Sequence, residues 1–320
     1  IRHKMNLKLK KILYLPHPRG FCAGVDRAIN IVELSLDKYG PPIYVRHEIV
    51  HNPWVIRDLE SKGVIFIENL RDAPEGSRVI FSAHGIPISV LNEAKNREMP
   101  FIDATCPLVI KVHNEAKRLH KDGAHIFLIG HEGHPEVIGT MGQIPQDAIT
   151  LIQKKEDIKK IDNNNYGKVA LITQTTLSVD DTKEIIEDLK NIFPEIIQPP
   201  KEDICYATTN RQLAIKSIAN DCDLIYVIGA NNSSNSLRLV EVGKKSGCNQ
   251  THLISDVSEV DWQEIEKEQK IGLTAGASAP DILIQDFIDK MNQLYDVEIK
   301  NISVADENIT FKIPRELNER

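Results

Sequence analysis

Residues 224–235 read LIYVIGANNSSN, and this stretch indicates the fold. A continuous apolar run, Leu224–Ile228, is followed by a glycine and then by small polar residues. A strand that is apolar at every position, and not at alternate ones, is typical of parallel sheets covered on both faces. Five more runs of this kind lie along the chain: Ile43–Val45, Val79–Phe81, His125–Ile129, Val169–Ile172 and Ile271–Leu273.

Stretches with helical periodicity lie between these apolar runs. They are Asp26–Lys38, Val109–Lys121, Asp180–Ile192 and Arg211–Ala219. Strands that alternate with helices along the chain predict an α/β fold with parallel sheets.

Three of the five cysteines share one local pattern, a short loop followed by a helical stretch. The segments are RGFCAGVDRA around Cys22, DATCPLVIKV around Cys106 and DICYATTNR around Cys205. Each cysteine opens a block in which two strands end in polar loops, and ligands of open α/β sheets bind at such strand ends. The repeat predicts three similar α/β lobes in a pseudo-threefold arrangement around a shared centre. The expected boundaries are 12–106, 107–202 and 203–290, with a C-terminal tail, 291–320, packing back on the lobes.

The three cysteines leave several chemistries open. No C-x-x-C pair is present, and an odd number of cysteines argues against a disulfide framework. Buried thiols, a zinc ion held with a histidine, and an iron–sulfur cubane on three thiolates are all compatible with the spacing. A cubane held by three thiolates would keep one iron open as a Lewis acid. Cys222 and Cys248 lie outside the pattern and are expected to be structural thiols.

Composition excludes several classes of function. The net charge of −7 disfavours nucleic acid and anionic membranes as partners. No apolar run approaches the roughly 18 residues of a membrane span, and the chain is expected to be cytoplasmic, with Met5 as its natural start. Neither a P-loop nor a G-x-G-x-x-G fingerprint occurs, so electrons for any redox reaction would come from a separate carrier protein.

Six motifs in a fixed order identify a known family. They are RGFCAGV from Arg19, SAHG from Ser82, DATCP from Asp103, GHPE from Gly133, QTTLS from Gln174 and NSSN from Asn232. Together they resemble the 4-hydroxy-3-methylbut-2-enyl diphosphate reductase family, also called LytB, over residues 12–290. One small departure is Ala230, where many members carry serine.

The resemblance implies an iron–sulfur oxidoreductase, with three lobes around one [4Fe–4S] cluster per chain. It would reduce (E)-4-hydroxy-3-methylbut-2-enyl diphosphate to isopentenyl and dimethylallyl diphosphates, the last step of the non-mevalonate isoprenoid pathway, with electrons from a donor such as ferredoxin or flavodoxin. The implied cluster ligands are Cys22, Cys106 and Cys205, and the implied catalytic residues are Glu136, Thr175 and His134. The implied binding residues for the allylic diphosphate are His51, His84, His134, Thr175, Ser233, Ser234, Asn235 and Ser278.

The residue types agree with a diphosphate ligand. Hydroxyl, amide and imidazole donors and the free N–H groups of a first helical turn are suited to phosphate oxygens, and Asn232–Asn235 precede a helix. A quinolinate-synthase-like [4Fe–4S] dehydratase is an alternative, although a dicarboxylate substrate would favour arginines. A non-enzymatic iron–sulfur sensor is another, although a DNA-binding one would need a basic element.

Other histidines receive no role. His131 and His134 are three residues apart, with Gly133 and Pro135 expected to break any helix, so they do not form the metalloprotease motif. The surface histidines are expected to be His3, His113, His120 and His252.

Overall fold

The computed structural model describes residues 8–162 and 165–318, which form two compact units. The five-stranded unit comprises the described residues up to Cys22, His51–Pro53 and Tyr206–Asn308. The two-sheet unit comprises Ala23–Val50, Trp54–Cys205 and the described residues from Ile309. Met5 and His3, which the sequence suggests as the natural start and a surface histidine, lie outside the described residues.

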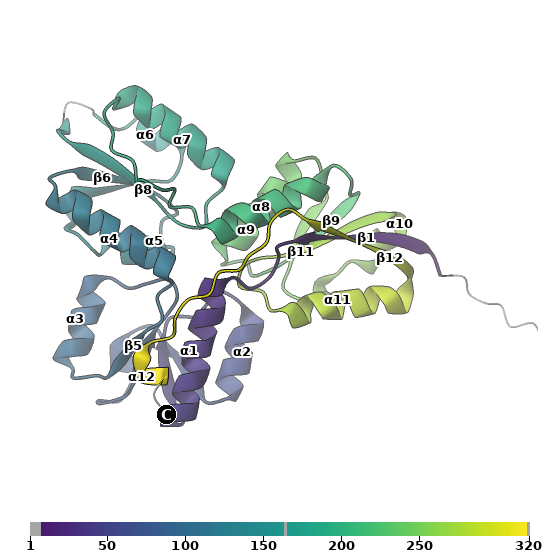
Figure 1. Cartoon of the computed structure of the whole chain (residues 1–320), viewed down its shortest axis with the longest axis horizontal. Coiled ribbons are helices and arrows are strands. Elements are labelled where there is room, and N and C mark those ends of the chain that lie inside the picture. The colour runs from purple at the N-terminus through teal and green to yellow at the C-terminus, as the bar shows by residue number, and fades with distance from the viewer. Residues whose placement is uncertain (1–7, 163–164, 319–320) are drawn as a thin grey trace, which may run out of the picture. The chain divides into compact units, whose positions relative to one another are not determined.

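The five-stranded unit is built on one parallel sheet with the strand order β10-β9-β11-β1-β12. Figure 1 labels four of these strands, β1, β9, β11 and β12. Its strands are β1 (Lys10–His17), β9 (Leu224–Ile228), β10 (Thr251–Ile254), β11 (Lys270–Ala275) and β12 (Asp296–Ser303). Its helices are α8 (Tyr206–Ala219), α9 (Ser234–Lys245), α10 (Trp262–Lys267) and α11 (Asp281–Leu294). Every residue of β9 is buried, as expected for a strand covered on both faces.

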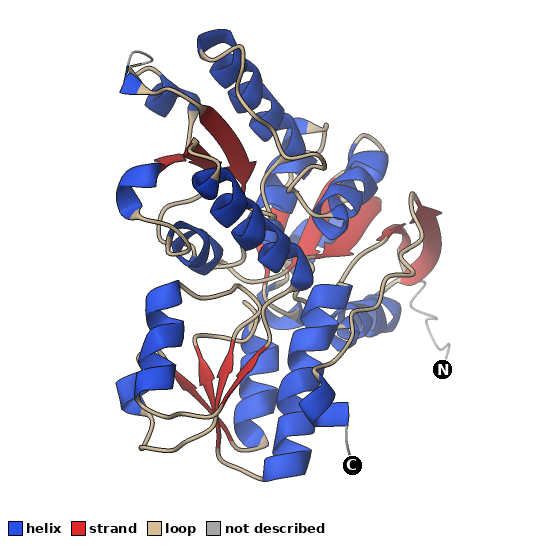
Figure 2. Ribbon diagram, turned by 60° about the vertical axis from the view of Figure 1, so that its left-hand side comes forward, coloured by secondary structure: helices blue, strands red, loops and turns tan. Residues whose placement is uncertain are grey.

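The two-sheet unit holds a four-stranded parallel sheet, β3-β2-β4-β5, and a three-stranded parallel sheet, β7-β6-β8. The strands of the first are β2 (Ile43–Arg46), β3 (Val64–Ile67), β4 (Val79–Phe81) and β5 (Phe101–Asp103). Helices lie on both sides of this sheet (Figure 2). The helices that accompany it along the chain are α1 (Ala23–Tyr39), α2 (Pro53–Ser61), α3 (Ile88–Asn96) and α12 (Arg315–Asn318).

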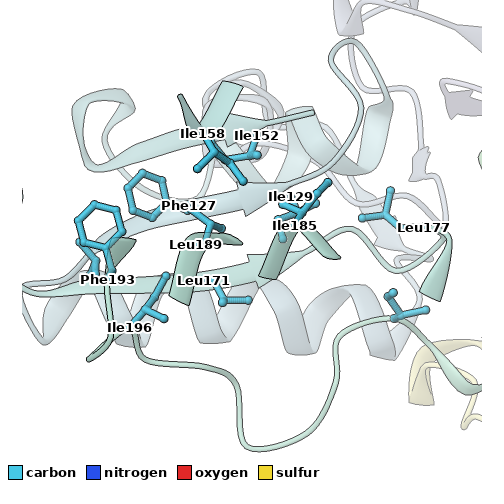
Figure 3. Packing of buried hydrophobic residues seen from close by; sticks show 12 residues of the cluster. Phe127, Ile129, Ile152, Ile158, Leu171, Leu177, Ile185, Leu189, Phe193 and Ile196 are labelled. Carbon is cyan, nitrogen blue, oxygen red and sulfur yellow. The ribbon is translucent and has the colours of Figure 1, made fainter. Parts of the chain in front are cut away.

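The three-stranded sheet has its own hydrophobic core. Its strands are β6 (His125–Ile129), β7 (Ile149–Ile152) and β8 (Val169–Thr173), and its helices are α4 (Pro107–Lys121), α5 (Pro135–Met141), α6 (Lys155–Ile158) and α7 (Val179–Ile192). Figure 3 shows Phe127 and Leu171 from the strands with Leu189 from α7 and Phe193 after it. Burial of such side chains, each contributing roughly 1.5–3 kcal/mol, fixes the sheet against α7.

Helix α4 shows why these sequences form helices. Val109, Val112, Ala116 and Leu119 recur at helical spacing and are buried. Pro107 occupies the first helical position, where its missing N–H leaves no hydrogen bond unmade. Basic residues fill the last turn, where they interact favourably with the helix dipole.

The α/β class is confirmed, and each of the six predicted strands is present. The predicted helix Arg211–Ala219 begins five residues earlier, at Tyr206, because the polar YATTN stretch is helical. The described part of the chain holds six further strands, among them β1, β12 and three strands of four residues. Among the described residues, no helix combines the length and apolarity needed to cross a membrane.

The first strand of the chain pairs with the last strands and not with its neighbours in sequence. β1, which lies largely inside the predicted first lobe, pairs with β11 and β12 in the sheet of the last one. Within the predicted tail, β12 pairs along the whole of β1, and α12 contacts α1. The lobe boundaries and their arrangement around a shared centre stay predictions.

Candidate active site

Each of the three patterned cysteines stands immediately before a helix. Cys22 precedes α1, Cys106 is the N-cap of α4, and Cys205 precedes α8. A helix N-terminus favours negative charge, so these are positions at which a thiolate is stabilised.

The three cysteines are also held by the same hydrogen bond. The N–H of each donates to the carbonyl of the residue two positions beyond the end of a parallel strand. The pairs are Cys22 to Ala277 after β11 at 3.2 Å, Cys106 to Ala83 after β4 at 3.0 Å and Cys205 to Thr175 after β8 at 3.0 Å. The repeat seen in the sequence is therefore a repeat of local structure.

The other two cysteines have a different environment. Cys22, Cys106 and Cys205 are half-buried, whereas Cys222 and Cys248 are buried in the core of the five-stranded unit. Burial raises the pKa of both core thiols, which disfavours the thiolate that a metal needs. All five cysteines lie within the described residues and form no disulfide.

Glu136 is a buried carboxyl group of the two-sheet unit with a raised pKa. Its side chain lies on α5 and is only 3% exposed. Its two carboxyl oxygens accept hydrogen bonds from Thr175, one from the backbone N–H at 2.7 Å and one from the hydroxyl at 2.9 Å. Burial raises the pKa of Glu136 to about 7, against the lowering effect of the Thr175 hydrogen bonds. A carboxyl group with this pKa holds a proton near neutral pH and can release it.

Asp203 is a neighbouring acid to which sequence reasoning assigned no role. Its carboxylate accepts from the N–H of Thr173 at 3.1 Å and lies 3.2 Å from the Lys111 ammonium. Burial raises the pKa of Asp203, and its charge in turn helps to raise the pKa of Glu136. An aspartate two residues before Cys205, like the one three residues before Cys106, was the available signal.

His134 contacts Glu136, and His84 contacts His134 in turn. His134 is the N-cap of α5, and its Nδ1 accepts the N–H of Glu136 at 3.2 Å. Neutral His134 therefore carries its hydrogen on Nε2, which can donate to an anion. The ring of His84 stands edge-on to that of His134, with centroids 5.9 Å apart. Because Thr175 also accepts from Cys205, this unit brings together His84, His134, Glu136, Thr175 and a cysteine loop.

The polar loop after β9 forms the N-terminus of α9. Ser233 is the N-cap, and its hydroxyl oxygen accepts from the N–H of Ser236. Asn235 accepts the N–H of Ala277 at 2.9 Å, which ties the loop after β9 to the loop after β11. Gly229 and Gly276 allow this approach, since a β-carbon at either would lie 2.1 Å from the Ser236 hydroxyl oxygen.

His51 belongs to the same group in the five-stranded unit. Its Nδ1 lies 3.2 Å from the amide nitrogen of Asn232, and its carbonyl accepts from the Ser278 hydroxyl at 2.9 Å. Ser233, Ser234, Asn235 and Ser278 are all buried. Since the N–H of Cys22 donates to the carbonyl of Ala277, this unit gathers a second cysteine loop with hydroxyl, amide and imidazole groups.

Two predictions about histidines and loops are wrong. His113, expected at the surface, is buried on α4, where a β-carbon at Gly85 would lie 2.6 Å from its ring, and burial lowers its pKa to about 4. Pro135 was expected to break any helix, but it is the first residue of α5, so Glu136 lies in a helix. His131 lies outside α5, so the exclusion of the metalloprotease motif holds.

Comparison with known proteins covers nearly the whole chain. The family model described as LytB protein matches residues 13–292. A 4-hydroxy-3-methylbut-2-enyl diphosphate reductase from Paracoccus denitrificans is 53% identical, with 98% of this chain and 100% of the relative covered. A protein of the same name from Hyphomonas neptunium is 52% identical, with 98% of this chain and 99% of the relative covered.

Solved structures agree with this assignment. The E-1-hydroxy-2-methyl-but-2-enyl-4-diphosphate reductase from Plasmodium falciparum has a TM-score of 0.93 at 42% identity, with 97% of both chains covered. A second structure, described as the terminal enzyme of the non-mevalonate pathway, has a TM-score of 0.64 at 30% identity, with 88% of this chain and 99% of that chain covered. The chain belongs to the LytB protein family.

Proposed function

We propose that this protein reduces (E)-4-hydroxy-3-methylbut-2-enyl diphosphate to isopentenyl and dimethylallyl diphosphates. The C4–O bond breaks, two electrons and two protons are consumed, and the oxygen leaves as water. Membership of the LytB family and the names of the relatives favour this reductase over the dehydratase and the sensor. The observation that carries the proposal is the buried Glu136 carboxyl group, whose pKa of about 7 suits it to deliver a proton.

The cysteines fit the cluster that this family uses. Cys22, Cys106 and Cys205 would hold it, since each precedes a helix and is half-buried, whereas the raised pKa values of Cys222 and Cys248 do not suit a ligand. When bound, a [4Fe–4S] cluster on three thiolates supplies single electrons and a Lewis-acidic iron.

Glu136, held by Thr175, would deliver the proton to the departing oxygen. The Thr175 hydroxyl donates to one carboxyl oxygen of Glu136 and the Thr175 N–H donates to the other, so the carboxyl group is held in one orientation. Hydroxide is a poor leaving group, so a proton given to the departing oxygen lowers the barrier. The second proton would reach the allylic carbon through the same group or through the substrate's own diphosphate.

Each unit has polar groups that would bind phosphate oxygens. His84 and His134 can donate from imidazole nitrogens, with Thr175 close to Glu136. In the five-stranded unit, the donors would be His51, Ser233, Ser234, Asn235 and Ser278. The N-terminus of α9 adds backbone N–H groups directed at the anion.

The electrons would come from a separate protein such as ferredoxin or flavodoxin, since the sequence has no dinucleotide-binding fingerprint. We place the enzyme in the cytoplasm, where thiols stay reduced, because its five described cysteines form no disulfide.

The test is an anaerobic one. Purified protein should carry roughly four irons per chain and reduce the allylic diphosphate with a chemical reductant. Cys22→Ser, Cys106→Ser and Cys205→Ser should each lose the iron and the activity, whereas Cys222→Ser and Cys248→Ser, the matched controls, should keep both. Equal iron loss in all five variants would contradict the ligand assignment, and iron binding without turnover would contradict the reaction.

A further inference from the structure

Arg211 holds the loop that carries Cys22. It lies on α8, has no exposed surface, and donates to the carbonyls of Gly20, at 2.9 and 2.8 Å, and Phe21, at 3.1 Å. Its charge is paired with Glu307 at 3.1 Å. A buried guanidinium thus fixes the two peptide groups immediately before the cysteine.

Arg27 does the same for the loop that carries Cys106. It lies on α1, and its guanidinium donates to the carbonyls of Thr105 at 3.1 Å and Ala104 at 3.4 Å. Its Nε donates to the carbonyl of Lys312 at 2.8 Å. The two carbonyls are again those of the residues immediately before the cysteine.

Lys111 holds the segment that leads to Cys205. It lies on α4, and its ammonium donates to the carbonyls of Glu202 at 2.9 Å and Lys201 at 3.0 Å. It also lies 3.2 Å from the carboxylate of Asp203, two residues before the cysteine. One point charge with three donors therefore replaces the guanidinium fork at this loop.

The three cations form a cyclic pattern along the chain. Arg27 and Lys111 stand five residues after Cys22 and Cys106, and Arg211 stands six residues after Cys205. Each holds not the loop of its own cysteine but that of another. The helix after Cys22 holds the Cys106 loop, the helix after Cys106 holds the Cys205 segment, and the helix after Cys205 holds the Cys22 loop.

We propose that Arg27, Lys111 and Arg211 are positioning residues for the three cysteine loops. Each cation binds carbonyls of the segment before a cysteine, and the cysteine N–H donates to the carbonyl of a residue after a strand, so the backbone that leads to each thiol is held at two points. The role in cluster binding rests on the proposed function, because that proposal makes the three thiols ligands.

The cyclic pattern gives an unambiguous experiment on the full chain. Hydrogen–deuterium exchange followed by mass spectrometry would be measured for peptides spanning residues 19–24, 103–108 and 201–207. In Arg27→Met, exchange should rise about tenfold in the Cys106 peptide, the size expected when a hydrogen bond to a charged group is lost. Lys111→Met should act in the same way on the Cys205 peptide, and Arg211→Met on the Cys22 peptide.

Simple weakening of a helix would give a different result. Arg27→Met would then affect the Cys22 peptide, which adjoins the same helix, and Lys111→Met would affect the Cys106 peptide. That outcome would overturn the proposal. Arg211→Lys serves where Arg211→Met does not fold, and it should still loosen the Cys22 loop because one ammonium cannot replace the fork. Unchanged exchange at the Cys22 peptide in Arg211→Lys would also count against the proposal.

Two cations that hold other parts of the chain are matched controls. Lys11 is buried and donates to the carbonyls of Ile265 and Glu266 at the end of α10. Arg118 lies on the same helix as Lys111 and pairs with Glu115. Lys11→Met and Arg118→Met should leave all three cysteine peptides unchanged, and Lys111→Arg should restore the protection that Lys111→Met removes.

Iron chemistry provides a second readout. Removal of iron by a chelator, followed by absorbance under anaerobic conditions, should be several-fold faster in Arg27→Met and Lys111→Met than in the controls. Exchange itself needs neither iron nor substrate. If exchange follows the cyclic pattern and the wild-type chain binds no iron, only the proposed function fails; if iron and turnover are normal but exchange is unchanged, only the positioning role fails.

Discussion

The strand-end region that holds Glu136 and Thr175 in the two-sheet unit and the region of Ser233–Asn235 in the five-stranded unit share a backbone plan but differ in chemistry. Both lie where parallel strands end and a helix begins, with an N-cap side chain that accepts a backbone N–H. The first encloses a buried acid whose pKa is raised to about 7, and the second encloses neutral hydroxyl and amide groups. The same backbone arrangement thus holds a titratable acid in one unit and uncharged hydroxyl and amide groups in the other.

The difference follows from the side chain that is buried. A carboxyl group out of water resists ionisation, so burial raises the pKa of Glu136 and favours its protonated form near neutral pH. Buried Ser234 and Asn235 have no charge to lose, so their burial shifts no titration and keeps uncharged polar groups out of water.

The largest effect is expected from a substitution in the region of Glu136 and Thr175. Glu136→Gln keeps the size of the side chain but removes the transferable proton, so kcat should fall by about 10²–10⁴ while the Kd for the substrate stays within a few-fold. Steady-state kinetics and substrate titration under anaerobic conditions measure both quantities. Glu132→Gln is the matched control, because Glu132 is exposed in the segment just before α5 and should be dispensable. Near-normal turnover in Glu136→Gln would move the role of proton donor to His134 or Thr175.

A smaller effect is expected from a substitution in the polar group of the five-stranded unit. His51→Ala removes a group that would bind the diphosphate, so KM should rise about tenfold while kcat changes little, the size expected for one hydrogen bond to a charged group. His252→Ala in the same unit is the control, since His252 pairs with Glu264 and is given no role in binding. A loss of kcat at unchanged KM would show that the second region also takes part in the chemistry.

The smallest effect concerns the pH dependence that Glu136 and Thr175 should give to the activity. If protonated Glu136 is the active form, activity should fall as the pH rises through about 7. The Thr175 hydroxyl stabilises the ionised carboxylate and so lowers this pKa. Thr175→Val should therefore move the basic limb of the pH–kcat profile upward by roughly one unit. Thr176→Val should leave the limb in place, and a downward shift in Thr175→Val would contradict the assignment.

The same pKa has a consequence for stability. Because the pKa of Glu136 is higher in the folded state than its usual value of 4.5, the folded state binds the proton more tightly than the unfolded state. Its contribution to the free energy of unfolding is therefore complete below about 4.5 and is lost as the pH rises towards 7.

Local sequence determined much of this protein. Continuous apolar runs predicted β4, β6 and β9 with the bounds that the structure has, because burial on both faces leaves no alternative to an apolar strand. The repeated cysteine loops were also readable, since each consists of adjacent residues at the start of a helix.

Tertiary structure decided what depends on partners distant in the chain. The pairing of β1 with β11 and β12 joins both ends of the chain in one sheet, and no local pattern specifies it. The raised pKa of Glu136 needs burial and Thr175, which is 39 residues away. Arg27, Lys111 and Arg211 look like ordinary helix cations in the sequence, and only the fold directs each of them to the carbonyls before a remote cysteine. Hydrogen bonds and burial depend on position in space, which the chain acquires only when it folds.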